Sequence, residues 1–131
     1  MGEFVPTTDK KVAVFLADGT EEIEALTVVD LLYRAGIPVT TVSVGAGPDV
    51  RSSHGVRIVA DETVGRLDFD DFDMLVLPGG MPGTAHLHAC KPLTGQLLRF
   101  YKEGKPLAAI CAAPTILADL GILEGRPATC F

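Results

Sequence analysis

The chain has 131 residues, of which 47% are hydrophobic and 21% charged, and its mean hydropathy is +0.32. A chain of this length buries enough apolar surface to fold without disulfides or a structural metal, and its composition excludes disorder, collagen-like repeats and coiled coil. Seventeen acidic against eleven basic residues give a formal net charge of −6. With no basic run, nucleic acid and anionic lipid are poor partners, and a small molecule or a protein is favoured.

The beginning of the chain and its cysteines bear on its location. Residues 1–9 are predicted to be a flexible leader without the basic start and apolar run of a secretion signal. No apolar stretch approaches the roughly 18 residues that span a bilayer, so no membrane partner is expected. Cys90, Cys111 and Cys130 are an odd number without paired spacing, which favours reduced thiols. We therefore expect a cytoplasmic protein.

The elements expected along the chain alternate between strands and helices. The apolar run 11–17 is typical of a strand covered on both faces, and a helix from Glu21 to Ala35 follows, capped by Thr20 or Asp18. The further expected strands are 39–44, a short strand or hairpin arm at 56–59, 73–77 and 107–110, and the further helices are 84–90, 93–103 and 113–120. This alternation predicts one α/β domain over 10–131, with a parallel sheet and helices on both faces.

The last six residues, 126–131, have the pattern of the entry to another strand and stop at an aromatic side chain. Natural termini are usually polar and loose. We therefore expect the domain to be incomplete at its C-terminal end, either as a piece of a longer protein or completed by a second polypeptide.

Cys111 stands where the last predicted strand meets the last predicted helix, with small residues two positions to either side, Ala109 and Ala113. This pattern is similar to a nucleophile elbow, whose crowded turn aims a nucleophile above the sheet. Amide groups at the start of a helix would lower the pKa of a thiol there. The alternative is a buried thiol that only packs, which is the commoner role of a cysteine between alanines.

Pro78-Gly79-Gly80 ends the strand expected beside that of Cys111, at the sheet edge where open α/β folds bind ligands. One interpretation is that the N–H groups of Gly80 and Ala112 hold a developing oxyanion, with Gly79 in the pocket. The other is an ordinary tight turn.

Three segments together resemble the ThiJ/PfpI superfamily in its DJ-one-like branch: Leu-Ala-Asp-Gly-Thr-Glu-Glu-Ile-Glu-Ala at 16–25, Val-Leu-Pro-Gly-Gly at 76–80 and Ala-Ile-Cys-Ala-Ala-Pro-Thr at 109–115. The resemblance implies a flavodoxin-like three-layer sandwich with a mostly parallel sheet, backbone donors at Gly80 and Ala112, and a homodimer. It also implies that Glu24 is protonated and donates a hydrogen bond to the Cys111 thiolate. Helical spacing places Glu24 on a flank with Val28 and Leu31, but without the family all three glutamates would be interpreted as solvated partners of the helix dipole.

The chain departs from that family in two places. The protease-like branch has a histidine directly after the nucleophile, where this chain has Ala112, which argues against peptidase activity. The DJ-one-like branch often carries a histidine on the strand after the elbow helix, where the corresponding position is Cys130, and the family's final elements are absent. Cys130 is therefore a candidate pocket residue, and whether Cys111 has a general base besides Glu24 is left open.

Histidines elsewhere offer weaker signals. On a helix, His86 and Cys90 share a face, but no further ligands lie nearby in the sequence, so no metal site is predicted. His54 is interpreted as a loop residue, at a position where the family often places a polar or basic side chain near the pocket.

The leading hypothesis is a cysteine-dependent enzyme of the glyoxalase or deglycase kind that acts on small reactive carbonyl compounds without a cofactor. Cys111 is the nucleophile and Glu24 exchanges protons with the adduct. Two alternatives remain open. One is a redox sensor or stress-protective chaperone in which the same cysteine becomes oxidised. The other is a family member that binds a ligand without catalysis.

Overall fold

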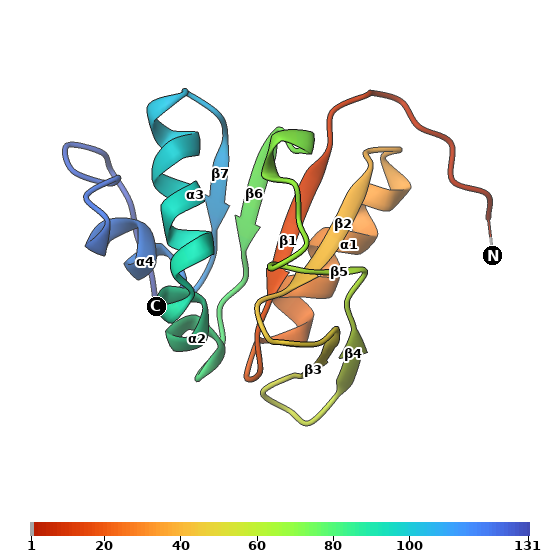
Figure 1. The fold of residues 1–131 in the computed structure, drawn as a ribbon, viewed down its shortest axis with the longest axis horizontal. Helices are drawn as coiled ribbons and strands as arrows, with labels where there is room; N and C mark the ends of the chain where they lie inside the picture. Colours follow the sequence, from red (N-terminus) through yellow and green to blue (C-terminus); the bar gives the residue numbers. More distant parts are fainter. Residues whose placement is uncertain (1) are drawn as a thin grey trace.

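A sheet of five parallel strands, in the order β5-β2-β1-β6-β7, forms the centre of the molecule in the computed structural model, which describes residues 2–131 (Figure 1). The strands are β1 Val12–Leu16, β2 Val39–Ser43, β5 Glu62–Thr63, β6 Met74–Leu77 and β7 Leu107–Ala109. Every residue of β1 is buried, because β2 and β6 pair with its two edges and its side chains pack into hydrophobic clusters on both faces of the sheet. The strands predicted from the apolar runs are therefore confirmed, each slightly shorter than expected.

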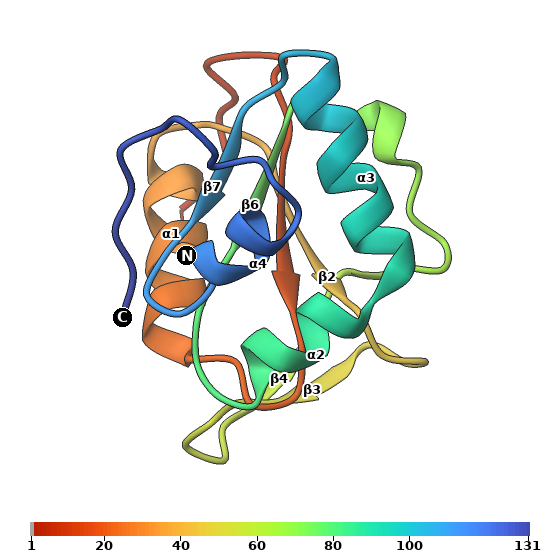
Figure 2. The same ribbon diagram turned by 90° about the vertical axis from the view of Figure 1, so that its left-hand side faces the viewer.

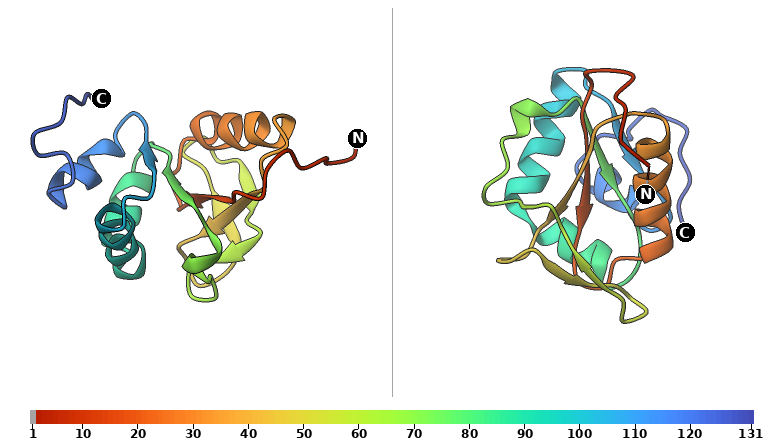
Figure 3. Two further views of the ribbon diagram at one scale, coloured as in Figure 1. Left: turned by 90° about the horizontal axis from the view of Figure 1, so that it is seen from above. Right: turned by 90° about the vertical axis from the view of Figure 1, so that its right-hand side faces the viewer.

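Helices cover both faces of this sheet, as Figure 3 shows from above. The side chains of β1 alternate between two hydrophobic clusters, as the two-residue period of a strand requires. Ala13 and Phe15 belong to the cluster beneath α2, α3 and α4, while Val12 and Val14 belong to the cluster beneath α1. The helices are α1 Glu22–Arg34, α2 Gly83–Ala89, α3 Lys91–Lys102 and α4 Pro114–Asp119. This arrangement confirms the three-layer sandwich.

The cap of α1 differs from the sequence prediction. Neither Thr20 nor Asp18 caps the helix, because Glu21 takes that position and its Oε1 accepts a hydrogen bond of 2.9 Å from the Ile23 N–H. Asp18 instead accepts a hydrogen bond from the Arg51 N–H at 3.0 Å, and Thr20 is fully buried. Glu22 and Glu24 thereby fall in the first turn of α1.

A hairpin leaves the sheet after β2. Its strands are β3 Asp49–Arg51 and β4 Arg57–Val59, paired antiparallel, so the predicted hairpin arm at 56–59 is confirmed. The turn between them is held against the loop that precedes α1, since the Ser53 N–H donates to the Thr20 carbonyl oxygen at 2.8 Å. The hairpin thus brings His54 above the start of α1.

The two ends of the chain carry no helix or strand over residues 2–11 and 126–131. Thr7 donates from its N–H to the Gly36 carbonyl oxygen at 2.8 Å and from its hydroxyl to that of Ala35 at 2.7 Å. Residue 1 of the predicted leader lies outside the described residues, and the flexibility of the leader stays a prediction. At the other end, the chain turns back past β7 after α4 (Figure 2). Within residues 2–131 no helix is long and apolar enough to cross a membrane.

Candidate active site

The candidate site lies at the carboxyl ends of β6 and β7. These strands run parallel with Leu77 opposite Ala109, so the residues two positions further along, Gly79 and Cys111, come side by side. A Cβ atom placed on Gly79 would lie 2.8 Å from the Cβ of Cys111 and 3.0 Å from the Ile110 carbonyl oxygen. Only glycine fits at position 79, and its bare Cα lets the two loops meet.

Cys111 has the backbone conformation expected of an elbow. Its φ is 61°, and among residues 2–131 it is the only residue other than glycine with a positive φ. A side chain in this left-handed region is strained and persists only when its surroundings hold it there. Ala113, two residues on, is fully buried, and its N–H closes the turn on the Ile110 carbonyl oxygen at 3.1 Å. The small residues around Cys111 therefore serve the turn that the sequence predicted.

Glu24 reaches this turn from the first turn of α1. Its Oε1 accepts a hydrogen bond of 3.0 Å from the Gly79 N–H, and the same oxygen would lie 2.6 Å from a Cβ on Gly79. The Glu24 carboxyl group also acts on the Cys111 thiol and raises its pKa. The structure thus brings Glu24 and Cys111 together, and the interpretation of Glu24 as a solvated dipole partner is wrong.

The pKa of the Cys111 thiol is raised above its ordinary value, first because the sulfur is desolvated and then because it hydrogen-bonds Glu24 and lies near its charge. A hydrogen bond from the Ala112 N–H lowers the pKa, and the charge of Glu21 raises it. The expected lowering by the helix start is therefore outweighed. One amide cannot offset burial together with a neighbouring carboxylate.

The two predicted backbone donors differ in their surroundings. The Ala112 N–H points to the sulfur of Cys111. Gly80 has a φ of 95°, and its carbonyl oxygen accepts hydrogen bonds from the N–H and the hydroxyl of Thr84. Within residues 2–131 the Gly80 N–H donates to no protein acceptor. The oxyanion role of these two groups stays a prediction.

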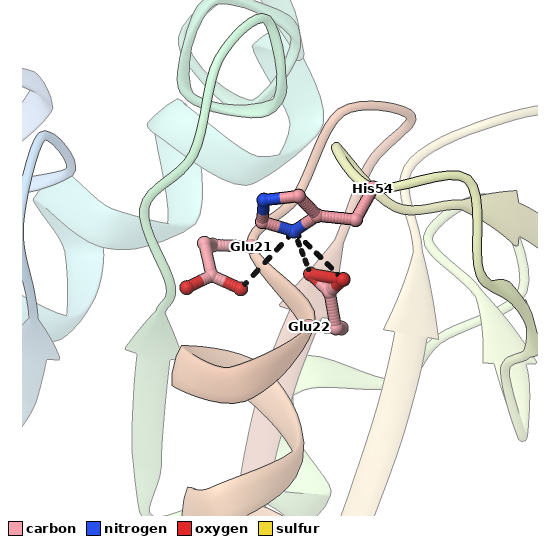
Figure 4. A group of neighbouring side chains, drawn as sticks. All are labelled: Glu21, Glu22 and His54. Carbon is pink, nitrogen blue, oxygen red and sulfur yellow. Dashed lines mark hydrogen bonds and ion pairs between the residues drawn. The ribbon is translucent and has the colours of Figure 1, made fainter.

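Glu21, Glu22 and His54 form a cluster beside this site, which Figure 4 shows. Nδ1 of His54 lies 2.8 Å from both carboxylate oxygens of Glu22 and 3.9 Å from a carboxylate oxygen of Glu21. The hydrogen bond with His54 lowers the pKa of Glu22 to about 2, and the same bond raises the pKa of His54. Three potential metal-ligand atoms here lie within 4.8 Å of one another. The ion pair between His54 and Glu22 accounts for this proximity.

Sequence reasoning missed this pair, because 32 residues separate its members. The signal that could have found it is the hairpin itself. A loop between two short strands that follow β2 lies at the carboxyl edge of the sheet, where α1 also begins.

The remaining candidates lie in different places. His86 and Cys90 line one cavity of about 370 Å³, although Cys90 lies just after α2 with an extended backbone, so the two do not share a helix as predicted. Nδ1 of His86 donates to the Asp18 carbonyl oxygen at 2.7 Å. Cys130 is exposed, and its neighbour Phe131 hydrogen-bonds Cys111. A larger cavity, about 530 Å³, lies at the amino ends of β1 and β2, away from Cys111. Because ligands of parallel sheets bind at the carboxyl ends, we do not assign that cavity to the site.

Comparison with known proteins identifies the class to which this fold and site belong. The model of the DJ-1/PfpI family matches residues 10–131, and the chain therefore belongs to the DJ-1/PfpI family. The structure of Toxoplasma gondii DJ-1 in its oxidized form superposes with a TM-score of 0.90 at 38% identity, covering 93% of this chain and 67% of that one. The predicted resemblance is confirmed.

Among curated relatives, Protein dj-1beta of Drosophila melanogaster is 42% identical over 93% of this chain and 65% of its own length. Protein DJ-1 homolog B of Arabidopsis thaliana is 40% identical over 95% of this chain and 29% of its own length. The chain thus spans about a third to two thirds of these relatives. The names of other relatives state an activity. They include a deglycase of Thermococcus kodakarensis, 33% identical over 91% of this chain and 70% of its own length, and a glutathione-independent glyoxalase of Caenorhabditis elegans, 38% identical over 83% and 58%. A protein of Bacillus subtilis named as a candidate cysteine protease is 33% identical over 92% and 70%.

Proposed function

We propose that the protein is a cofactor-independent enzyme that converts small reactive carbonyl compounds, with Cys111 as the nucleophile and Glu24 as its proton partner. The observation that carries this proposal is the meeting of two reactive groups at one glycine. Cys111, in a strained elbow, and the carboxyl of Glu24, from a different element, both lie against Gly79. The names of the deglycase and glyoxalase relatives support the same class of reaction.

The raised pKa of Cys111 sets the order of the proton transfers. Near neutral pH the sulfur holds its proton, so a base must take that proton as the sulfur attacks. Glu24 lies against Gly79 together with Cys111 and is the group we propose to take the proton. The sulfur adds to the carbonyl carbon, and the electron pair of the C=O bond moves to oxygen, where the N–H groups of Gly80 and Ala112 stabilise the charge. Glu24 then returns the proton to that oxygen and completes a neutral hemithioacetal.

For a 2-oxoaldehyde, the hemithioacetal leads to a hydroxy acid without an external oxidant. A base removes the proton from C1, the electron pair of that C–H bond forms a C1=C2 double bond, and the C2 carbonyl oxygen takes up a proton to give an enediol. Protonation of the enediol at C2 and loss of the proton from the C1 hydroxyl then give a 2-hydroxyacyl thioester. Water then cleaves the thioester and releases the free Cys111 thiol. The net change is addition of one water, so neither a redox cofactor nor a metal enters the balance.

Replacing the nucleophile tests the proposal. Cys111→Ser should abolish conversion of methylglyoxal to lactate, since a serine hydroxyl is a far weaker nucleophile than a thiol beside a base. Cys90→Ser is the matched control, because Cys90 is also half-buried and lines a cavity with His86, away from Glu24. Turnover should be followed as lactate formed. Full activity in the Cys111→Ser protein would refute the mechanism. Equal losses in both variants would show that the effect is not specific to Cys111 and would refute its assignment as the nucleophile.

A redox sensor is the second candidate function. The thiol of Cys111 is half-buried and touches both an amide and a carboxyl group, which are the groups that would hydrogen-bond an oxidised sulfur. Selective gain of two oxygens on Cys111 under peroxide, in a protein without measurable turnover, would favour this function over the enzyme.

We also propose that the protein is a cytoplasmic homodimer. Its three free cysteines suit a reducing compartment. Exposed apolar side chains occur on α1, at Ile23 and Leu31, and on the hairpin, at Val56 and Val59, and such surfaces often mark protein contacts. Sedimentation equilibrium should give twice the chain mass. An Ile23→Lys variant should give the monomer mass, and a monomeric wild-type protein would refute the dimer.

A further inference from the structure

The C-terminal segment returns to the candidate nucleophile. After α4 the chain turns back past β7, and the Phe131 N–H donates a hydrogen bond of 2.7 Å to the Cys111 carbonyl oxygen (Figure 2). Cys130, one residue before that donor, is exposed, and Cys111 is half-buried. Cys111 and Cys130 are 19 positions apart in the sequence, and this hydrogen bond, from the residue after Cys130 to Cys111 itself, holds their backbones next to each other.

This hydrogen bond limits how far apart the two cysteines can be. Standard backbone dimensions on either side of a 2.7 Å bond keep the two Cα atoms within about 7.5 Å of each other. Disulfides join Cα atoms that are usually about 4.4–6.8 Å apart. The separation therefore overlaps the range of disulfides, and a bond forms once the segment of Cys130 turns its side chain toward Cys111.

The segment that carries Cys130 is free to make such a movement. Within the described residues, positions 127–130 donate no backbone hydrogen bond, so the segment is held by the bonds of Arg126 to Leu123 and of Phe131 to Cys111. Cys90, in contrast, stands at the start of α3 and lines the cavity with His86. Of the two other thiols, the backbone hydrogen bond places Cys130 beside Cys111.

We propose that Cys130 is the resolving thiol of Cys111, so that a peroxide converts the pair into an intramolecular disulfide. In the first step the Cys111 sulfur attacks one peroxide oxygen, the O–O bond breaks, and a sulfenic acid and an alcohol, or water, are formed. In the second step the Cys130 sulfur attacks the Cys111 sulfur, an S–S bond forms, and the sulfenic oxygen leaves as water. Two thiols and one peroxide yield one disulfide, one water and one alcohol or second water.

The consequence is a reversible block at the candidate site. A disulfide removes the nucleophile that the proposed function needs and protects it from oxidation to the sulfinic acid, which most thiol reductants cannot reverse. The inference rests on Cys111 being a reactive thiol, as the proposed function also does, but it requires no carbonyl chemistry.

Peptide mapping after peroxide treatment tests the pairing. Cleavage after glutamate places the three cysteines in separate peptides, Cys90 in 63–103, Cys111 in 104–124 and Cys130 in 125–131. Dilute wild-type protein treated with one equivalent of hydrogen peroxide, then alkylated and digested without reductant, should yield peptides 104–124 and 125–131 joined in one species. Reductant should separate them. Cys90→Ser should give the same species, while Cys130→Ser should lose it and accumulate two oxygens on Cys111 instead.

Two results would overturn the inference. One is a wild-type protein whose Cys111 gains two oxygens as fast as in Cys130→Ser, with no joined species. The other is a joined species found only in a covalent dimer, which would place the bond between two copies. Turnover of methylglyoxal by the reduced wild-type protein separates this inference from the proposed function. Turnover without the joined species refutes only the disulfide, and the joined species without turnover refutes only the enzyme.

Discussion

Cys111 and Cys90 are alike in sequence context and differ in the structure. Both are half-buried, and each precedes a helix with a proline in its first turn and no side-chain cap. Cys90 has ordinary backbone angles, φ −79° and ψ 97°, whereas Cys111 has a φ of 61° and a carboxyl partner from α1. The comparison teaches that a position before a helix does not by itself distinguish a candidate nucleophile. A strained turn and a partner from a distant element set Cys111 apart.

Removing the carboxylate of Glu24 should change the reactivity of Cys111 strongly and leave that of Cys90 unchanged, which is the largest effect we expect. Because Glu24 raises the pKa of Cys111, Glu24→Gln should lower it, and iodoacetamide should react with Cys111 at lower pH than in the wild type. Turnover should nevertheless fall about 10²–10⁴-fold, since the variant has no group to accept the proton. The pH profiles of alkylation at Cys111 and Cys90, read by mass spectrometry, together with kcat/KM, measure both effects.

Glu22→Gln is the control for this prediction, because Glu22 is the neighbouring carboxylate that bonds His54 and does not shift the pKa of Cys111. Slower alkylation of Cys111 in Glu24→Gln would show that the carboxyl donates its proton to the sulfur. That is the state implied by the family resemblance, and it would reverse the proton order given above.

Adding a methyl group at Gly79 should destabilise the fold, whereas adding one to a glycine in open space should not. In Gly79→Ala the new Cβ would meet Glu24 Oε1 at 2.6 Å and the Cys111 Cβ at 2.8 Å. We expect a loss of about 1–3 kcal/mol in the free energy of unfolding, the usual cost of overpacking. Gly95→Ala, in the interior of α3 with open space around it, should instead gain about 0.5–1 kcal/mol. Urea unfolding of both variants measures the difference, and a neutral Gly79→Ala would show that the site relaxes freely.

The smallest expected effect concerns pH and the pair of His54 and Glu22. The raised pKa of His54 stabilises the fold below the unfolded value of 6.5, and this stabilisation is lost as the pH rises through the folded pKa. The lowered pKa of Glu22 stabilises the fold above 4.5, and this is lost as the pH falls toward about 2. The difference in Tm between wild type and His54→Gln should therefore peak between pH 4.5 and 6.5 and decrease as the pH rises through the raised pKa of His54.

His88→Gln is the matched control for that series, since His88 faces Asp119 at a longer 3.6 Å. Alkylation of Cys111 should also slow slightly in His54→Gln, because the charge of Glu21 would be less compensated, whereas Cys90 should be unaffected. A Tm difference that does not change with pH would mean that His54 only packs.

The sequence predicted those parts of the fold that leave a pattern. The buried strands β1 and β6 are continuous apolar runs, and their ends at Asp18-Gly19 and Pro78-Gly79 mark the loops of the site. The strands β3 and β5 were not expected, because two or three residues, mostly polar, are too few to show a period. The predicted cap of α1 was wrong because Asp18 and Thr20, both residue types that often cap helices, are held in other contacts.

For the site, Cys111 could be found from its small neighbours, but Glu24 could not be chosen from periodicity. Its supposed apolar flank includes Leu31, which is 59% exposed, so burial along α1 does not explain its position. The position of Glu24 is explained instead by its contact with Gly79, 55 residues away in the sequence. The pKa of Cys111 was predicted in the wrong direction, because a sequence displays the helix start but not the desolvation and the charge that oppose it.

The place of β1 in the sheet has a consequence for synthesis of the chain. β1 precedes both of its partners in the chain: it pairs with β2 on one side, and on the other side it pairs with the much later β6, with Val12 opposite Met74. Until that later segment emerges, a wholly apolar strand presents one unpaired edge to the cell. Nascent chains of this protein are therefore exposed to aggregation for the time it takes to translate the intervening stretch, and folding is completed by a long-range closure.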